Sequence, residues 1–254
     1  MPRKMNKPII GERFKTNQGC ECVVIEYNNA FNVVVQFQDN FQHTKSVRTG
    51  DLRKGEVSNP FFPSVFGVGY FGIDSNSKVG YKTGTREYMF WKGAMERCYS
   101  ETSLIKSPTY RGCSVASEWH NFQNFAEWCQ LQTGFNEAGW QLDKDLLGQS
   151  LDNKGYHPKT CVFVPQEVNT LFIVPSTKTD GLPTGVSYCK DRGNYQAGCG
   201  AGGYRKALGR FVTSDLAYEA YLKYKKIRVS EVLEQHKSRL DARVVLKLEE
   251  FSKE

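Results

Sequence analysis

No stretch of this sequence approaches the roughly eighteen consecutive apolar residues of a transmembrane helix, which excludes a membrane span. The basic residues 1–7 lead into no apolar segment, so we expect no secretory signal and a cytoplasmic protein. The chain also lacks low-complexity tracts and internal repeats. At 39% hydrophobic and 24% charged residues it is too apolar for a disordered chain and can bury several cores.

Paired cysteine and histidine motifs are scarce. Cys20-Glu-Cys22 has no second pair at zinc-finger spacing, and strand alternation places both thiols on one face, so we interpret them as core residues. In a reducing cytoplasm the eight cysteines are expected as thiols or metal ligands. His43 and His236 have no evident partners, which suggests surface positions.

Acidic residues are scarce in one segment. Between residues 181 and 230, nine lysines and arginines stand against three acids, an excess of six out of the chain's net charge of +7. A local positive field captures polyanions such as nucleic acid. A solvated basic surface is the alternative, and charge alone does not separate the two.

Short runs rich in β-branched and aromatic residues fill the N-terminal segment. Residues 22–27 and 31–37 flank a turn at Asn28-Asn29, and a third strand is expected through 43–47. This spacing predicts a small, curved β-barrel module of the Src-homology or Tudor type over residues 1–58. Because such modules are usually interaction modules, a protein partner is the expected ligand, although the sequence does not name it.

The middle segment, residues 59–178, mixes helices and strands. The aromatic-rich Pro/Gly stretch 59–72 is expected to pack against the next domain of the chain. Tyr88, Trp91, Met95 and Cys98 have helical spacing, and a second helix with an aromatic core face is expected to open at Ser117. Strands at 141–146 and 161–165, then a helix from 166, predict a strand–loop–strand–helix unit.

The last segment, residues 179–254, predicts three strands, at 185–190, 194–199 and 204–211. A helix capped by Thr213 or Ser214 comes next, with an apolar stripe that includes Ala217 and Tyr221. We therefore expect a three-stranded antiparallel sheet packed on a helix, with a helical tail after it.

A twisted sheet can enter the major groove of DNA as a helix can. If Val186, Ala197, Leu208 and Phe211 face the helix, we expect alternation to turn the basic and tyrosine side chains outward. Arginine forks match two acceptors on the guanine edge, whereas lysines more often hold phosphates. The predicted DNA-binding residues are Tyr188, Lys190, Arg192, Tyr195, Tyr204, Arg205, Lys206 and Arg210.

Three motifs of this segment resemble the plant ethylene-response-factor-type DNA-binding domain, which is also the C-terminal module of phage HNH homing endonucleases. They are Leu182-Pro-Thr-Gly-Val186, Gly193-Asn-Tyr-Gln-Ala197 and Leu208-Gly-Arg-Phe-Val-Thr213, together with the Ala/Tyr helix at 217–224. The match covers about the last third of the chain and is specific as an ordered set. The resemblance implies that the sheet reads double-stranded DNA in the major groove.

The middle segment resembles the same phage proteins. Its matching pieces are Trp91-Lys-Gly-Ala-Met-Glu-Arg-Cys98, Tyr110-Arg-Gly-Cys-Ser-Val115, Trp119-His-Asn-Phe-Gln-Asn-Phe125, Leu142-Asp-Lys-Asp145, Gly155-Tyr-His-Pro158, Cys161-Val-Phe-Val-Pro165 and Asn169. With the preceding module, the resemblance runs over most of the chain. It implies a core of the HNH, or ββα-metal, type.

An HNH site uses a histidine to activate water and a divalent metal to offset charge on the scissile phosphate. Where such enzymes carry an Asp-His pair this chain has Asp143-Lys144, and a protonated lysine is a poor general base. His157 is the candidate replacement, or else a surface residue of the loop. The candidate catalytic residues are Asp143, Lys144, Asp145 and His157.

Metal ligands are implied by the same resemblance. Asp143, Asp145 and Asn153 offer oxygen ligands to Mg²⁺ or Mn²⁺ if the core is catalytic. The alternative is that the two carboxylates anchor loops and pair with Lys144 or an arginine. A structural Zn²⁺ site is a further candidate, although buried thiols are the favoured interpretation of its ligands, Cys98, Cys113, Cys161 and His120.

The sequence thus predicts a multidomain α+β protein with segments 1–58, 59–178 and 179–254. The first functional hypothesis is a phage-type, sequence-specific double-stranded DNA-binding protein in the host cytoplasm, without catalysis. The second is an active metal-dependent endonuclease that cuts or nicks at its recognition site. The third is a protein–protein adaptor that uses the N-terminal module and the C-terminal helix.

Overall fold

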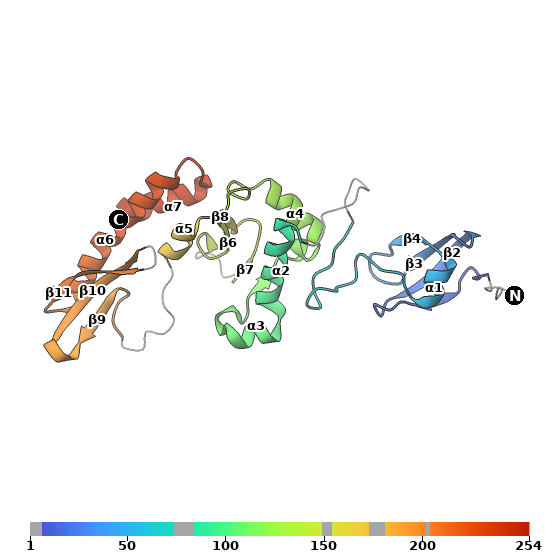
Figure 1. Cartoon of the computed structure of the whole chain (residues 1–254), viewed down its shortest axis with the longest axis horizontal. Coiled ribbons are helices and arrows are strands. Elements are labelled where there is room, and N and C mark those ends of the chain that lie inside the picture. Colours follow the sequence, from blue (N-terminus) through green and yellow to red (C-terminus); the bar gives the residue numbers. More distant parts are fainter. Residues whose placement is uncertain (1–6, 74–83, 149–153, 173–180, 202–203, 254) are drawn as a thin grey trace. The chain divides into compact units, whose positions relative to one another are not determined.

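The computed structural model describes residues 7–73, 84–148, 154–172, 181–201 and 204–253, except for the side chains of Ala201 and Tyr204 (Figure 1). The protein is a mixed α+β chain that divides into two compact units, Met1–Cys129 and Gln130–Glu254. The division falls inside the predicted middle segment, and the predicted boundaries near 58 and 178 stay predictions. No helix among the described residues is long and apolar enough to cross a membrane.

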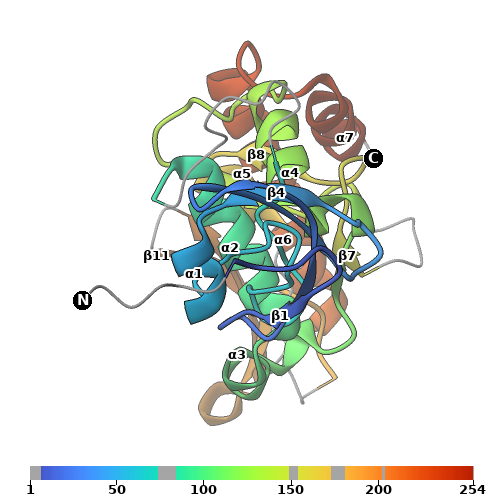
Figure 2. The ribbon, with the colours of Figure 1, turned by 90° about the vertical axis from the view of Figure 1, so that its right-hand side faces the viewer.

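The first unit begins with a four-stranded antiparallel meander in the order β1-β2-β3-β4. Its strands are β1 Arg13–Lys15, β2 Glu21–Asn29, β3 Asn32–Phe37 and β4 Thr44–Val47, and helix α1 Thr49–Lys54 comes after them. Figure 2 looks onto these curved strands, with α1 beside them. The β2–β3 ladder continues to the pair Asn29 and Asn32, so the turn lies two residues later than Asn28-Asn29.

The prediction of a closed barrel is wrong. The sheet runs from β1 to β4 with only sequential pairings, and among the described residues β4 does not pair with β1. One face of the sheet nonetheless carries a hydrophobic core. In it, the side chains of Cys22, Val24, Val33, Val35 and Phe37 are almost fully buried. The predicted core position of Cys22 is confirmed.

The Pro/Gly stretch packs on the helices that come after it, as expected. Tyr70 and Asn121 form an isolated parallel β-bridge. In it, Tyr70 N donates to His120 O and Phe122 N donates to Tyr70 O, each at 2.9 Å. The predicted first helix is confirmed as α2 Arg86–Tyr99, which buries Trp91, and the Trp91 indole donates to Trp119 O at 2.7 Å.

The rest of the first unit consists of short elements. They are α3 Glu101–Lys106, the 3₁₀ helices η1 Pro108–Tyr110 and η2 Ser117–His120, β5 Ser114–Val115 and α4 Phe122–Gln130. The second predicted helix is thus split into η2 and α4. Its aromatic face is core as predicted, since Trp119, Phe122 and Phe125 are buried.

The second unit opens with the predicted strand–loop–strand–helix unit. Strand β6 Gln141–Asp143 pairs antiparallel with β8 Val162–Val164, and helix α5 Gln166–Leu171 begins directly after β8. The intervening segment includes β7 Gly155–Tyr156. Both strands are shorter than predicted, but the order of elements is confirmed.

The C-terminal sheet and helices form as the pattern predicts. Strands β9 Val186–Cys189, β10 Asn194–Ala201 and β11 Tyr204–Phe211 form an antiparallel sheet in the order β11-β10-β9 (Figure 1). Helix α6 Ser214–His236 packs on all three strands, and α7 Ala242–Lys253 packs on α6. Thr213 is the N-cap, and its hydroxyl accepts from Leu216 N at 3.3 Å.

Candidate nucleic-acid interface

The C-terminal sheet has one face on helix α6 and one open face. Val186 pairs with Ala197, and both are fully buried against Ala217 of α6. Directly paired residues share a face, and the side chains alternate along each strand. Ser187, Gln196 and Arg210, which pair across the three strands, therefore lie together on the opposite, open face.

A β-bulge interrupts the pairing of the two longer strands. The register shifts between Ala197 and Gly198, so that Ala197 pairs with Gly209 but Gly198 pairs with Ala207, and Leu208 is the extra residue. The shift keeps both Leu208 and Phe211 on the helix side, where they pack on the buried cluster of Val186, Ala197 and Ala217. Gly198, Gly200 and Ala207 leave the open face with a floor of small residues.

Arg205 lies across this floor. A Cβ at Gly198 would stand 2.5 Å from Arg205 Nε, so the arginine side chain passes directly over the glycine. From there Arg205 Nη2 donates to Gly185 O at 3.3 Å, just before β9. The guanidinium of an outer strand is thereby held over the sheet, and it has further N–H donors for a ligand.

Among the described residues no carboxylate pairs with Arg205 or Arg210, and both side chains are exposed. The three strands contain no aspartate or glutamate at all. The positive charge of the open face is therefore not neutralised within the sheet, which is what an anionic partner requires.

The predicted outward orientation of Tyr188 and Tyr195 is wrong. Tyr195 packs on the buried cluster under α6 and pairs directly with Tyr188. The two rings lie 5.1 Å apart on the helix side, where Tyr188 keeps 49% exposure. A strand repeats its facing every second residue, so Tyr188 must share the face of Val186.

The remaining predicted residues lie at the margins. Lys190 and Arg192 are exposed in the 3₁₀ turn η4 Lys190–Arg192, which joins β9 to β10. Lys206 is exposed but on the helix side, with its Nζ 4.6 Å from the ring centre of Tyr224 in α6. The side chain of Tyr204 lies outside the described part of the chain. Of the predicted residues whose side chains are described, Arg205 and Arg210 share the open face.

Two polar residues of the open face, Ser187 and Gln196, were not predicted as site residues. They bring hydroxyl and amide groups into the row of Arg210. The signal was present in the sequence, because Ser187 comes directly after Val186 and Gln196 precedes Ala197, and both apolar residues face the helix.

The predicted catalytic residues make hydrogen bonds within their own loops. Asp143 Oδ1 accepts from Leu146 N at 2.6 Å and from Asp145 N at 3.1 Å, so the carboxylate caps the turn that ends β6. Burial raises the pKa of Asp143 above its ordinary value, against the opposing effect of the Leu146 hydrogen bond. This carboxylate anchors its own loop.

Lys144 and His157 are also engaged within the unit. Lys144 Nζ donates to Asp145 Oδ1 at 2.5 Å. His157 Nδ1 accepts from Lys159 N at 3.1 Å, and His157 O accepts from Cys161 N at 2.9 Å. A half-buried imidazole held by a local turn in this way shapes the loop before β8.

Asn153, a predicted metal ligand, lies outside the described residues. Within the part of the chain that is described, no three His, Cys, Asp or Glu side chains gather to hold a metal ion. His120 Nε2 instead lies 3.1 Å from Val115 O, and the side chains of Cys98, Cys113 and Cys161 are buried. Burial raises the pKa of Cys161 to about 12. Both predicted metal sites therefore stay predictions.

His236 is buried, so its predicted surface position is wrong. Its Nε2 lies 3.2 Å from Glu167 Oε2, and its Nδ1 lies 3.2 Å from Arg239 Nη2. Arg239 in turn donates to Glu137 Oε2 at 3.0 Å. This network fixes the end of α6 against α5 and the loop before β6.

Comparison of the chain with family models, with curated proteins and with solved structures finds no match.

Proposed function

We propose that this protein binds double-stranded DNA and reads base edges in the major groove with the open face of β9–β11. The observation that carries the proposal is the placement of Arg205 and Arg210 on one exposed, acid-free sheet face above a floor of small residues. The resemblance of this segment to ethylene-response-factor-type domains gives the same assignment.

The geometry suits the groove in three respects. A two- or three-stranded β-surface fits a major groove about 12 Å wide, and it needs a bracing element behind it, here α6. Gly198, Gly200 and Ala207 add little height, so base edges can come close to the strands. Arg205 and Arg210 each present the fork that recognises guanine, and Gln196 presents an amide of the kind that pairs with adenine.

Phosphate contacts fall to the basic residues at the margins. Lys190 and Arg192 extend from the turn at one end of the sheet. Such contacts set the position of the sheet on the duplex without specifying sequence. Because they contact phosphates, these residues should contribute most to the salt dependence of the DNA affinity.

The middle of the chain is proposed as a degenerate HNH-like core between an N-terminal module and the DNA-binding domain. A metal-dependent endonuclease is the second candidate function, and the β6–β8 pair with α5 after it is the observation that favours it. The non-catalytic function is preferred because Asp143 is committed to its own turn and Lys144 pairs with Asp145. A protein–protein adaptor remains the third candidate.

Selection of bound fragments from random duplex DNA, with and without Mg²⁺, separates the three functions. The proposal predicts enrichment of a sequence motif and intact fragments in both conditions. Fragments cut only with metal support the endonuclease. Failure to retain any duplex at low salt leaves the adaptor and rejects the proposal.

A further inference from the structure

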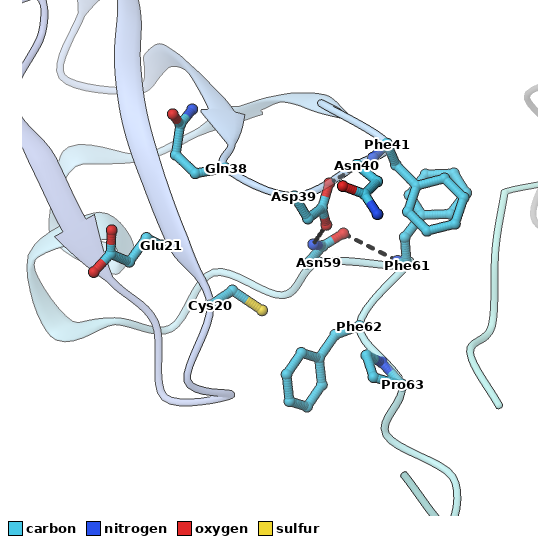
Figure 3. Close-up of a pocket in the computed structure, with 10 residues that line it drawn as sticks. All are labelled: Cys20, Glu21, Gln38, Asp39, Asn40, Phe41, Asn59, Phe61, Phe62 and Pro63. Atoms are coloured by element: carbon cyan, nitrogen blue, oxygen red, sulfur yellow. Dashed lines mark hydrogen bonds between the residues drawn. The ribbon is translucent and has the colours of Figure 1, made fainter. Parts of the chain in front are cut away.

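A cavity of about 240 Å³ opens beside the N-terminal sheet (Figure 3). It belongs to the first compact unit, whereas the proposed DNA-binding face belongs to the second. Its walls come from the start of β2, the β3–β4 loop and the segment after α1. The lining residues are Cys20, Glu21, Gln38, Asp39, Asn40, Phe41, Asn59, Phe61, Phe62 and Pro63. A space of this size is below the range of about 300–1,000 Å³ for drug-sized ligands and suits one long side chain.

One wall of the cavity is a braced aromatic stack. The rings of Phe41 and Phe61 are stacked at 4.4 Å, and Tyr70 meets both, at 5.3 and 5.8 Å. His43 meets Phe61 in an edge contact, with the ring centres 5.5 Å apart. Phe41 nevertheless keeps 49% exposure, so a fixed ring face remains available to a ligand.

The polar part of the cavity is equally well fixed. Asn59 is only 3% exposed, and its Nδ2 donates to Asp39 Oδ2 at 2.5 Å while its Oδ1 accepts from Phe61 N at 3.0 Å (Figure 3). Asp39 Oδ1 accepts from the backbone N–H groups of Phe41 and Gln42, both at 3.0 Å. Three hydrogen bonds therefore hold the Asp39 carboxylate beside the aromatic wall, and a fourth fixes the Asn59 amide that donates one of them.

The charge of the lining selects the ligand. Glu21 and Asp39 are acidic, and the lining contains no lysine, arginine or histidine, although the chain as a whole carries +7. Arg13 Nη1, outside the lining, lies 3.7 Å from Glu21 Oε2, so Asp39 is the lining carboxylate that pairs with no lysine or arginine among the described residues. Its charge disfavours a phosphate or another acid. Aromatic faces and carboxylates together attract a desolvated cation, at about 0.5–2 kcal/mol for a ring contact.

Other rings of the same module already carry a cation from this chain. Lys7 lies over Tyr27 at 4.6 Å, and Arg53 lies over Phe14 at 5.7 Å. Among the described residues no lysine or arginine side chain lies over Phe41, Phe61 or Phe62. We propose that this cavity binds a lysine or arginine side chain of a partner polypeptide, between the aromatic wall and the acidic lining.

The test is amide NMR of the ¹⁵N-labelled full chain, titrated with the blocked tripeptides Gly-Lys-Gly and Gly-Arg-Gly. Blocked peptides with norleucine or glutamate in the centre are the controls. The proposal predicts saturable shifts at residues 38–42 and 59–62 with the basic peptides alone. Phe41→Ala should weaken binding by about two- to thirty-fold, the range that a ring–cation contact supplies. Glu21→Gln should weaken it by a smaller factor.

The matched control is Phe31→Ala, because Phe31 is 75% exposed in the β2–β3 turn of the same module but outside the cavity. It should bind as the unmodified chain does. Equal shifts with norleucine, shifts with glutamate, no saturable shift with either basic peptide, or an equal loss in Phe31→Ala each overturns the proposal. The spectrum of Phe41→Ala reports whether that variant folds, and its duplex DNA affinity should be unchanged.

Discussion

The side chain of Arg205 lies so close over Gly198 that a Cβ at residue 198 would stand 2.5 Å from Arg205 Nε. Any other residue at 198 would push the guanidinium off the sheet and away from Gly185 O. A glycine in the middle of a strand usually weakens it. Here it determines where the positive charge of the neighbouring strand lies.

Gly198→Ala should therefore weaken binding to the selected DNA site, with little effect on unrelated duplex. The expected loss is about 1–3 kcal/mol, the discrimination that one bidentate arginine–guanine pair supplies. Gly200→Ala is the matched control, since a Cβ there meets nothing within 4 Å. Fluorescence anisotropy with selected and scrambled duplexes measures both, and equal losses for the two variants would contradict the positioning role.

Arg205→Ala and Arg210→Ala should relax the sequence preference at distinct base positions. Lys190→Ala should instead weaken binding to all duplexes alike and reduce the salt slope by about one, because it removes one phosphate contact. Repeating the fragment selection and the salt titration for each variant checks this. Identical behaviour of the arginine and lysine variants rejects direct readout by these arginines.

The chain should not nick plasmid DNA in Mg²⁺ or Mn²⁺, because the Asp143 carboxylate caps its own turn. In the proposed HNH-like assignment, Lys144 also stands where such enzymes carry the general-base histidine. A supercoiled-plasmid assay at rising metal concentration measures this directly. Metal-dependent nicking that Asp143→Ala abolishes would defeat the non-catalytic account, with a Glu118→Ala variant as a control for trace contamination.

Asp143 also predicts a pH dependence of stability. Burial raises the pKa of its carboxyl above 3.8, so the native state holds the proton to higher pH than the unfolded chain does. The free energy of unfolding should therefore fall as pH rises through the window between these two pKa values. Asp143→Asn keeps an acceptor for both amides but does not ionise.

Urea unfolding of both proteins between about pH 4 and pH 7 measures that contribution. The stability of the unmodified chain relative to Asp143→Asn should decrease across this range. A relative stability that is constant or that increases would show that the carboxylate is not held in a desolvated site.

Strongly patterned elements were predictable from sequence. The strands β9–β11, the capped helix α6 and the aromatic helix α2 lie where their periodicity places them, because each buries a regular apolar face. The prediction that Tyr188 faces outward was wrong because it followed from the residue type. Tyr188 is two residues after the buried Val186, and this spacing places it on the helix side. The bulge at Ala197 and Gly198 has no clear sequence signal, although it decides which side chains of β11 face outward.

Contacts between residues far apart in the sequence could not be predicted from local patterns. The buried position of His236 depends on Glu167 and Arg239 meeting it from other elements, which spacing does not reveal. The cavity beside the N-terminal sheet likewise joins residues near 20, 40 and 60. Whether a curved meander closes into a barrel depends on β1 and β4 meeting, and local patterns do not determine that.

The most direct test of the account is the affinity of the full chain for its selected duplex, compared with that of the double variant Arg205→Ala, Arg210→Ala across a range of salt. The account predicts salt-dependent binding by both proteins, with preference for the selected site over scrambled DNA only in the unmodified chain. A double variant that keeps this preference, or an unmodified chain that binds no duplex at low salt, would contradict it.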